Sequence, residues 1–207
     1  MQSIVIQGTA REELGKKSAK AIRRDGGVPC VLYGQSGNVH FSADSSSFKG
    51  LIYTPDFHKV ELEIAGSKYE AILKDVQFHP LKDTVEHVDF QELTPGKPVI
   101  TQIPVKLVGN SEGVKAGGKL QLKVRKLDVK VKPEDLVERI EVNVDDLQLG
   151  KSMKISQINT GNIQVMNPPG IPVASCEIPR ALKSKASKAE AAAEATEEAP
   201  AEEAAAE

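Results

Sequence analysis

Residues Arg11–Gly34 read REELGKKSAKAIRRDGGVPCVLYG, a pattern typical of a basic helix that runs directly into an apolar strand. At 100° per residue, the cations of this helix fall on an arc of about 120°. They are Lys16, Lys17, Lys20, Arg23 and Arg24. The opposite side carries Leu14, Ser18, Ala21 and Ile22. We therefore expect one face to pack on a core while the other holds the positive charges in water.

Two interpretations of the charged face are open. Clustered ammonium and guanidinium groups repel one another, and a polyanion such as a nucleic-acid backbone relieves that repulsion. The alternative is an ordinary solvated helix face, because most runs of charge have no other role. Glu12 and Glu13 do not decide between them, since the helix dipole favours acidic residues at a helix start in either case. Asp25-Gly26-Gly27 then ends the helix, because glycine adopts the left-handed conformation that closes it.

Short strand patterns surround this helix in the first 92 residues. They cover Ser3–Gln7, Cys30–Tyr33, Val39–Ser42, Val60–Ile64, Tyr69–Phe78 and Thr84–Gln91. Asp44 or Ser45 can cap a short helix that runs to Leu51. The connection Ala65-Gly66-Ser67-Lys68 between two of the strands is a hairpin signature. Strands with one or two helices between them predict a small antiparallel β-barrel as the N-terminal domain, residues 1–92.

Beyond a turn-rich linker at residues 93–98, almost every pattern is that of a strand. The strands are expected at Ile100–Val108, Lys119–Val131, Arg139–Val144, Lys154–Ser156, Ile163–Val165 and Ile171–Ile178. Residues 99–180 are therefore predicted to form an all-β C-terminal domain. Residues 181–207 are a low-complexity Ala/Glu-rich tail that we expect to be disordered or transiently helical. The predicted fold class is mainly β with a few α-helices.

Polar side chains on the later strands of the first domain give a second signal. Gln77 and His79 alternate with Val76 and Phe78, and His87 and Asp89 alternate with Val88 and Phe90. If both strands lie in one sheet, the apolar side chains face a core and the polar ones share a surface, with Tyr33 as an aromatic neighbour. Cations, hydrogen-bonding groups and one ring on a continuous surface match RNA, which presents phosphates, 2′-hydroxyls and shallow-groove base edges.

Each of these polar residues also has a structural interpretation. A lone histidine on a strand is more often structural than functional, and Tyr33 can sit at a sheet edge with its hydroxyl in water. Gln77 and Asp89 can be ordinary exposed residues or turn caps. His79, His87 and Asp89 can also be read as a metal triad of a metal-dependent hydrolase, but their spacing matches no dedicated metal motif.

No standard catalytic or nucleotide-binding motif occurs in the sequence, which lacks GxxxxGK[ST], GxGxxG, GxSxG and HExxH. We therefore expect no catalytic residue, no metal site, no cofactor and no small-molecule substrate. A protein–protein adaptor built on the second domain is the alternative from another class of function.

The overall charge of −2 hides a local organisation. Residues 1–180 carry 24 basic and 22 acidic groups, a net charge of +2, and the tail contributes −4. The first residues, MQSIVIQG, predict no secretory signal, and no run approaches the roughly 18 apolar residues that span a bilayer, so no membrane partner is expected. Cys30 and Cys176 fall in different predicted domains and fit buried thiols of a reducing compartment, which indicates the cytoplasm.

The first motif is followed by KDVQFHPLKDTVEHVDFQ, and the two together resemble the N-terminal domain of the bacterial large-subunit ribosomal protein of the L twenty-five type. Longer members of that family are called general stress protein Ctc. The string PEDLVERIEVNVDDLQLGKSMKIS resembles the extra β-rich domain of the long form, so the resemblance covers about residues 1–180. It implies a non-catalytic structural protein that binds 5S ribosomal RNA in the central protuberance of the large subunit.

The resemblance also implies which residues contact RNA. Matching positions are Arg11, Lys16, Lys20, Arg23, Tyr33, His87 and Asp89, and the geometric argument adds Lys17, Arg24, Gln77 and His79. Lys20 and Ala21 stand where the family commonly has helix arginines, and lysine keeps the charge but lacks the planar bidentate fork. Asp89 is expected to orient His87 or a neighbouring arginine, because a bare carboxylate would repel phosphate. The second domain is expected to contact neighbouring large-subunit proteins or ribosomal RNA.

Overall fold

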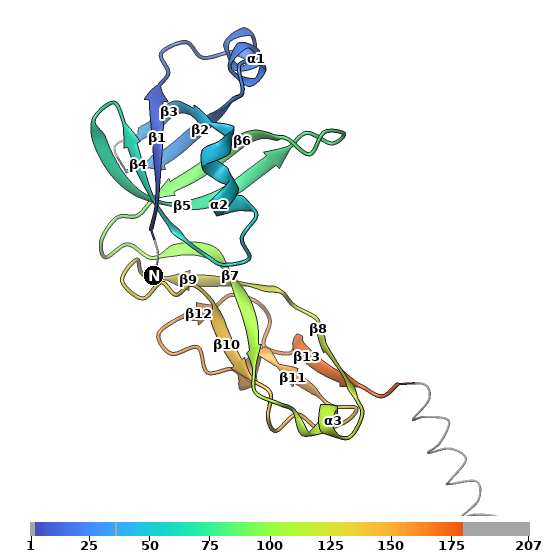
Figure 1. Ribbon diagram of the computed structural model, residues 1–207. Coiled ribbons are helices and arrows are strands. Elements are labelled where there is room, and N and C mark those ends of the chain that lie inside the picture. The colour runs from blue at the N-terminus through green and yellow to red at the C-terminus, as the bar shows by residue number, and fades with distance from the viewer. Residues whose placement is uncertain (1–2, 36, 180–207) are drawn as a thin grey trace, which may run out of the picture. The chain divides into compact units, whose positions relative to one another are not determined.

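A computed structural model of the chain describes residues 3–35 and 37–179. Its first part is a closed six-stranded β-barrel with the strand order β1-β3-β2-β6-β5-β4 (Figure 1). The barrel strands are β1 (Ser3–Ala10), β2 (Gly27–Gly34), β3 (Gly37–Asp44), β4 (Lys59–Ile64), β5 (Ser67–Phe78) and β6 (Val85–Glu92). The mainly-β fold class is confirmed, with one refinement: β1 runs parallel to β4 and β2 runs parallel to β6, so the barrel is not wholly antiparallel.

The barrel core is built from apolar side chains that alternate with outward-facing residues along each strand. Phe41, Phe48 and Phe90 are fully buried, and the Phe90 ring centroid lies 5.9 Å from that of Phe41 and 6.3 Å from that of Phe48. Gly8 is needed beside this cluster, since a Cβ there would lie 2.6 Å from Cδ2 of Phe41. These contacts therefore pack β1, β3, β6 and the short 3-10 helix that contains Phe48 into one core.

Three helical segments accompany the barrel, namely α1 (Lys16–Arg24), the 3-10 helix η1 (Ser45–Phe48) and α2 (Lys49–Ile52). Helix α1 begins at Lys16, the first predicted cation, so Glu12 and Glu13 precede the helix instead of lying at its start, and Gly15, with a φ of 143°, stands directly before it. The expectation that one face of α1 packs into a core is wrong. All of α1 is described and none of its residues is buried, while Leu14 just before it is 59% exposed. The helix lies at the edge of the barrel, where it contacts β2.

Two smaller sheets follow the barrel, with the strand orders β10-β7-β9-β12 and β11-β13-β8. Their strands are β7 (Val99–Val108), β8 (Lys119–Leu122), β9 (Lys126–Val131), β10 (Ile140–Asn143), β11 (Ser152–Lys154), β12 (Gln164–Val165) and β13 (Pro172–Glu177). The expected strand over Lys119–Val131 is thus two strands, in different sheets. Two short helices, α3 (Glu112–Lys115) and η2 (Ile155–Gln157), were not anticipated. Ser111 begins α3 by accepting a hydrogen bond from the Val114 N–H at its Oγ, 3.1 Å away.

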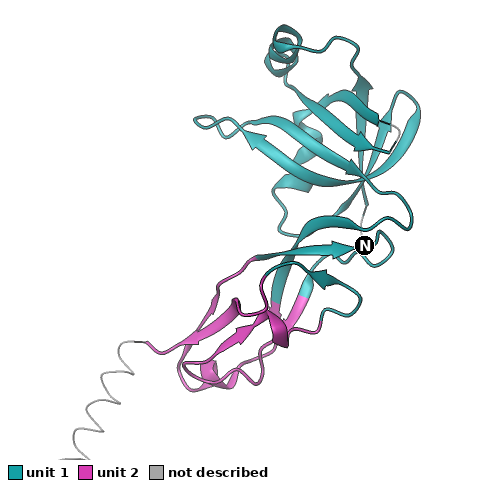
Figure 2. Ribbon diagram, turned by 180° about the vertical axis from the view of Figure 1, so that it is seen from behind, with its two compact units in different colours: residues 1–106, 126–140, 160–167 teal, residues 107–125, 141–159, 168–207 magenta. Residues whose placement is uncertain are grey.

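The chain folds into two compact units, which Figure 2 distinguishes by colour. Of the described residues, the first comprises those within 1–106, 126–140 and 160–167, and the second comprises those within 107–125, 141–159 and 168–179. The domain boundaries expected at residues 92 and 99 stay a prediction, and the Ala/Glu-rich tail lies outside the described residues. In the part of the chain that the structure describes, no helix is long and apolar enough to cross a membrane.

The β4–β5 hairpin closes through a two-residue turn, Ala65-Gly66, because Ile64 pairs with Ser67. Both turn residues have a positive φ, 49° for Ala65 and 84° for Gly66, which is the pattern of a type I′ turn. Glycine adopts this conformation freely, whereas alanine is strained in it by its Cβ. The predicted hairpin is therefore confirmed, but its turn has two residues instead of four, because Ser67 and Lys68 belong to β5. Alanine stands at the first turn position, where asparagine, aspartate or glycine is preferred.

Replacing Ala65 with asparagine should stabilise the protein. Asparagine tolerates the left-handed conformation better than alanine, so we expect Ala65→Asn to raise the free energy of unfolding by about 0.5–1 kcal/mol. Urea unfolding followed by circular dichroism measures this change. Gly66→Ala is the matched control and should lower the same free energy. A lower urea midpoint for Ala65→Asn would contradict the strain assigned to this turn.

Candidate RNA interface

The positive charges of α1 reach solvent, as the helical spacing predicted. Lys16, Lys17, Lys20, Arg23 and Arg24 are all exposed. The two arginines have nearby partners within the protein: Nε of Arg23 donates to the Glu86 carbonyl at 2.9 Å, and Nε of Arg24 lies 3.6 Å from a carboxylate oxygen of Asp25. Among the described residues, none of the three lysines takes part in an ion pair. The lysines are therefore the cations most available to an anionic ligand.

Polar contacts rather than buried side chains hold α1 on the barrel. The Arg23 bond to Glu86 joins the C-terminal turn of the helix to β6. At the other end, Nη2 of Arg11 donates to the Glu13 carbonyl and to Oγ of Ser18, both at 3.4 Å. Arg11 is itself fixed to β3 through its backbone N–H, which donates to the His40 carbonyl at 2.9 Å. Both ends of the helix are thus anchored to barrel strands by arginine.

The last apolar contact of α1 depends on a glycine. Ile22 is half-buried over the start of β2, where a Cβ on Gly27 would lie 2.9 Å from its Cγ2 atom. Only a residue without a side chain lets the helix approach the strand so closely. The Gly26-Gly27 pair therefore has two roles, because Gly26 has a φ of 87° where the helix ends.

Strand register brings the predicted polar side chains to one outer surface of β2, β6 and β5. We call this surface the polar face; it consists of Tyr33, Asp75, Gln77, His87, Asp89 and Gln91. In the sheet, Gln77 pairs with His87, Asp75 pairs with Asp89, and Tyr33 pairs with Gln91. The intervening residues of β6, Val88 and Phe90, are fully buried in the core. Alternation therefore places the polar face opposite the core.

Two members of the polar face were missed by the sequence reasoning. Gln91 continues the alternation that begins at His87 and Asp89, so the same period-two pattern, followed for one more step, would have found it. Asp75 gave no such signal. The register between β5 and β6 shifts between Leu73 and Asp75, and this bulge decides which residue of β5 lies beside Asp89.

The imidazole of His87 and the carboxylate of Asp89 form a close, shielded pair. Nδ1 of His87 lies 3.1 Å from Oδ1 of Asp89, and the two side chains are only 22% and 17% exposed. Neither atom has a hydrogen-bond partner among the described residues, and the same holds for the buried Nε of Arg11. The structure therefore brings Asp89 next to His87, as expected. It also leaves three polar atoms near the surface without a well-aligned partner.

The Asp89 carboxylate also affects the pKa of a buried thiol, that of Cys30 on β2. Burial, with a smaller contribution from the neighbouring Asp89 carboxylate, raises the pKa of the Cys30 thiol to about 12, while a backbone hydrogen bond and Arg11 act in the opposite direction. Cys30 is a free, fully buried thiol, as is Cys176 at 1% exposure. A thiol with such a pKa stays neutral at physiological pH, so Cys30 has a packing role.

The loop after β5 differs from the expectation. Phe78 is 44% exposed instead of buried; it is the last residue of β5 and pairs with Val85, although Val85 itself is buried. His79 lies beyond the strand, and its Nδ1 accepts the backbone N–H groups of Leu81 at 3.2 Å and Lys82 at 3.3 Å. This ring nitrogen is therefore used to close its own loop. An RNA contact by His79 stays a prediction.

A metal site is not formed by the residues that the structure describes. No group of three or more His, Cys, Asp or Glu side chains in residues 3–35 and 37–179 is arranged to hold a metal ion. His79, His87 and Asp89 are therefore not brought together as the alternative metal triad. What the structure does assemble is a row of exposed cations beside a face of hydrogen-bonding side chains.

Two family comparisons cover nearly all of the described chain. Residues 6–90 match the Ribosomal L25p family, and residues 98–180 match the family described as Ribosomal protein TL5, C-terminal domain. The chain is 43% identical over 190 residues to the large ribosomal subunit protein bL25 of Porphyromonas gingivalis, which covers 91% of this chain and 99% of that protein. The protein of the same name from Bacteroides fragilis is 43% identical over 194 residues with the same coverage. That of Christiangramia forsetii is 43% identical over 170 residues, or 81% of this chain and 77% of the relative.

Replacing Arg23 with lysine should loosen α1 while its charge is kept. Lysine lacks the Nε group that donates to the Glu86 carbonyl, so the C-terminal turn of the helix loses its bond to β6. We expect backbone amides of α1 to exchange with deuterium several-fold faster, because a hydrogen bond of this kind contributes about 1 kcal/mol. Hydrogen exchange followed by mass spectrometry or NMR measures the rate.

Arg24→Lys is the matched control for Arg23→Lys. Arg24 makes only an exposed contact with Asp25, with its own side chain 84% exposed, so its replacement should leave the exchange of α1 unchanged. Equal exchange rates for the two variants would show that the Glu86 contact does not hold the helix.

Proposed function

Because the chain belongs to the Ribosomal L25p family, we propose that it is a structural component of the large ribosomal subunit that binds 5S ribosomal RNA in the central protuberance. The resemblance seen in the sequence is confirmed at the level of the family. The matched relatives are named as proteins of the large ribosomal subunit, a class without enzymatic activity, so the prediction that the chain is not an enzyme is confirmed. Ribosomes of bacteria work in the cytoplasm, which agrees with the expected localisation.

A single observation carries the proposed RNA binding: α1 presents lysines that have no ion-pair partner among the described residues, next to a polar face on the same barrel. Lys16, Lys17 and Lys20 are exposed on a helix whose position is fixed by Arg11 and Arg23. Cations at fixed positions can neutralise neighbouring phosphates and release their counterions, which supplies much of the affinity for a nucleic acid. An ordinary solvated helix would not need both ends anchored to the barrel by arginine.

The polar face supplies what phosphate contacts cannot, namely recognition. Phosphate contacts position a nucleic acid, whereas groups that reach bases and sugars distinguish one structure from another. His87 and Gln77 lie side by side and offer hydrogen bonds to base edges or 2′-hydroxyls, and Tyr33, 44% exposed, offers a ring for packing on a sugar or base. Such a surface fits an internal loop with a widened, irregular groove better than a regular duplex, whose deep groove is closed to side chains.

The remaining part of the proposal concerns the second region of the chain. The match of residues 98–180 to a C-terminal domain of another ribosomal protein supports a role on the ribosome for this region as well. We expect it to contact neighbouring large-subunit proteins or ribosomal RNA, and binding to isolated 5S RNA should depend on the barrel alone.

Removing the three lysine charges should weaken binding to 5S RNA and reduce its salt dependence. Each neutralised phosphate contributes about 0.7–0.9 to the slope of log K against log salt concentration. If Lys16, Lys17 and Lys20 each contact one phosphate, the triple replacement by glutamine lowers the slope by roughly 2 to 3. Fluorescence anisotropy of the full chain with labelled 5S RNA, measured at four salt concentrations, gives the slope.

The control for this triple variant removes three lysines elsewhere. Lys106, Lys130 and Lys132 are exposed on or beside β7 and β9, and their replacement by glutamine changes the net charge by the same amount. We expect that variant to keep the wild-type slope. An unchanged slope for the α1 variant, or equal changes in both, would contradict the phosphate role of the helix.

His87 and Asp89 should act together in recognition. We expect His87→Ala to weaken binding to the 5S internal loop roughly tenfold, the effect of about 1.4 kcal/mol, and to affect a plain duplex much less. Because the imidazole and the carboxylate are in close contact, the two changes should not act independently, and adding Asp89→Asn should cost less than the sum of the single changes. A double-mutant cycle with both RNAs measures these terms. Equal losses on loop and duplex would remove His87 from the recognition surface.

A further inference from the structure

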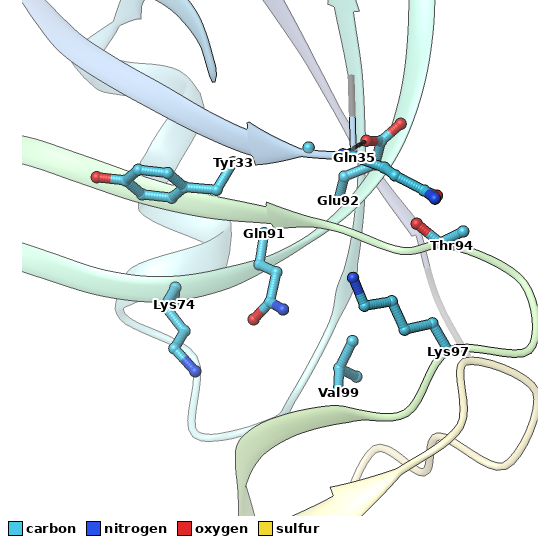
Figure 3. Close-up of a pocket in the computed structure, with 9 residues that line it drawn as sticks. Tyr33, Gln35, Lys74, Gln91, Glu92, Thr94, Lys97 and Val99 are labelled. Atoms are coloured by element: carbon cyan, nitrogen blue, oxygen red, sulfur yellow. Dashed lines mark hydrogen bonds between the residues drawn. The ribbon is translucent and has the colours of Figure 1, made fainter. Parts of the chain in front are cut away.

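A pocket of about 400 Å³ lies at one end of the polar face, within the size range of small-ligand sites. Figure 3 shows the side chains that line it. Those that matter for its chemistry are Tyr33, Lys74, Gln91, Glu92 and Lys97. They come from the ends of β2 and β6, from the bulge of β5 and from the segment that follows β6. All belong to the first compact unit.

The pocket is continuous with the polar face because two residues belong to both. Tyr33 and Gln91 are paired neighbours on β2 and β6, and both line the pocket. In Figure 3 the Gln91 amide points into the pocket between Lys74 and Lys97, with the Tyr33 ring above it in this view. An RNA strand that lies along the polar face therefore reaches the pocket without leaving the barrel surface.

A carboxylate is held in this pocket by a backbone contact. Oε2 of Glu92 accepts the backbone N–H of Gln35 at 3.0 Å. The space it occupies exists because residue 34 is glycine, since a Cβ there would overlap Oε2. A carboxylate oxygen can accept further hydrogen bonds beyond this one, so Glu92 offers fixed acceptor capacity to a ligand with N–H donors.

The pocket has a net positive charge, because two lysine ammonium groups line it beside one carboxylate. Lys74 sits at the β5 bulge, which redirects its side chain, and its Nζ donates to the Ile100 carbonyl at 2.9 Å. Lys97 lies in the turn closed by its own N–H bond to the Thr94 carbonyl, 3.2 Å. With Glu92, the lining residues carry a net charge of +1. Cations, a fixed acceptor, an amide and an aromatic ring are together the groups that bind a nucleotide.

We propose that this pocket binds one unpaired nucleotide of the RNA on the polar face, with guanine as the preferred base. The inference rests on the proposed RNA binding. Guanine presents two adjacent N–H donors on its Watson–Crick edge, which suit the Glu92 carboxylate, and a carbonyl oxygen that suits the amide donor of Gln91. Uracil presents its single N–H between two carbonyl oxygens, which the carboxylate would repel. Lys74 and Lys97 are placed to accompany the phosphate, and Tyr33 to stack on the base.

Kethoxal probing tests the proposal directly, because this reagent modifies the two donor nitrogens of unpaired guanine. The full chain is bound to 5S RNA, treated with kethoxal, and the modified guanines are read by reverse transcription. We expect at least one guanine that is reactive in free RNA to be protected in the complex. That protection should disappear with Glu92→Gln, which keeps an oxygen for the Gln35 N–H, and with Gln91→Ala.

Glu134→Gln is the matched control, since Glu134 is an exposed glutamate outside the barrel and its change alters the net charge equally. It should keep the protection. Gln91→Ala should also weaken 5S RNA binding about five- to tenfold, with the salt slope unchanged because the α1 lysines remain. Thermal unfolding of each variant reports that the barrel is intact.

The outcomes separate the pocket from the surface beside it. If RNA binds but both variants protect the same guanines as the wild type, the pocket proposal is overturned while the proposed function stands. If guanine protection is lost in the variants and retained in Glu134→Gln, the proposal is supported. Failure of the wild-type chain to bind 5S RNA under any salt condition would overturn the proposed function and the pocket assignment with it.

Discussion

Strand β6 is held between β2, to which it is parallel, and β5, to which it is antiparallel, and this register fixes which residues face outward. Val88 and Phe90 are fully buried, and burial of each such side chain contributes about 1.5–3 kcal/mol. A slip of one residue would expose both and bury His87 and Asp89 in their place. The packing of the core therefore fixes which side chains form the polar face. No ligand is needed to arrange them.

The same register decides where the charged helix sits. A helix of nine residues is marginal by itself in water, and α1 has no fully buried side chain, only the half-buried Ile22 against β2. Its position thus depends on polar anchors, above all the Arg23 bond to the Glu86 carbonyl, which lies on β6 next to His87. Arginine suits this task because its planar group can bond the backbone at Nε and still present its other nitrogens. Lysines, which have no such fixed geometry, occupy the positions left open to solvent.

Sequence patterns predicted most barrel strands because each is a short, regular alternation whose buried face is apolar. The hairpin at Ala65-Gly66 and the shared surface of Gln77, His87 and Asp89 followed from the same rule. Alternation fails where the strand itself is irregular. The shift between Leu73 and Asp75 decides which residue of β5 lies beside Asp89, and it is set by pairing with β6, which the sequence of one strand does not specify. The parallel pairs likewise arise from barrel closure, a long-range property.

The polar face also carries an energetic cost that bears on its proposed role. Nε of Arg11, Nδ1 of His87 and Oδ1 of Asp89 are shielded from water and lack hydrogen-bond partners among the described residues. A shielded polar atom without a partner costs about 1–3 kcal/mol, and a barrel selected for stability alone would satisfy or remove such atoms. Because these three atoms are shielded, a ligand reaches them only if their side chains reorient, and a ligand that aligns them with partners recovers part of that cost. Discrimination between RNA structures is therefore expected to reside in these groups, whereas the solvated lysines contribute affinity for any phosphate backbone.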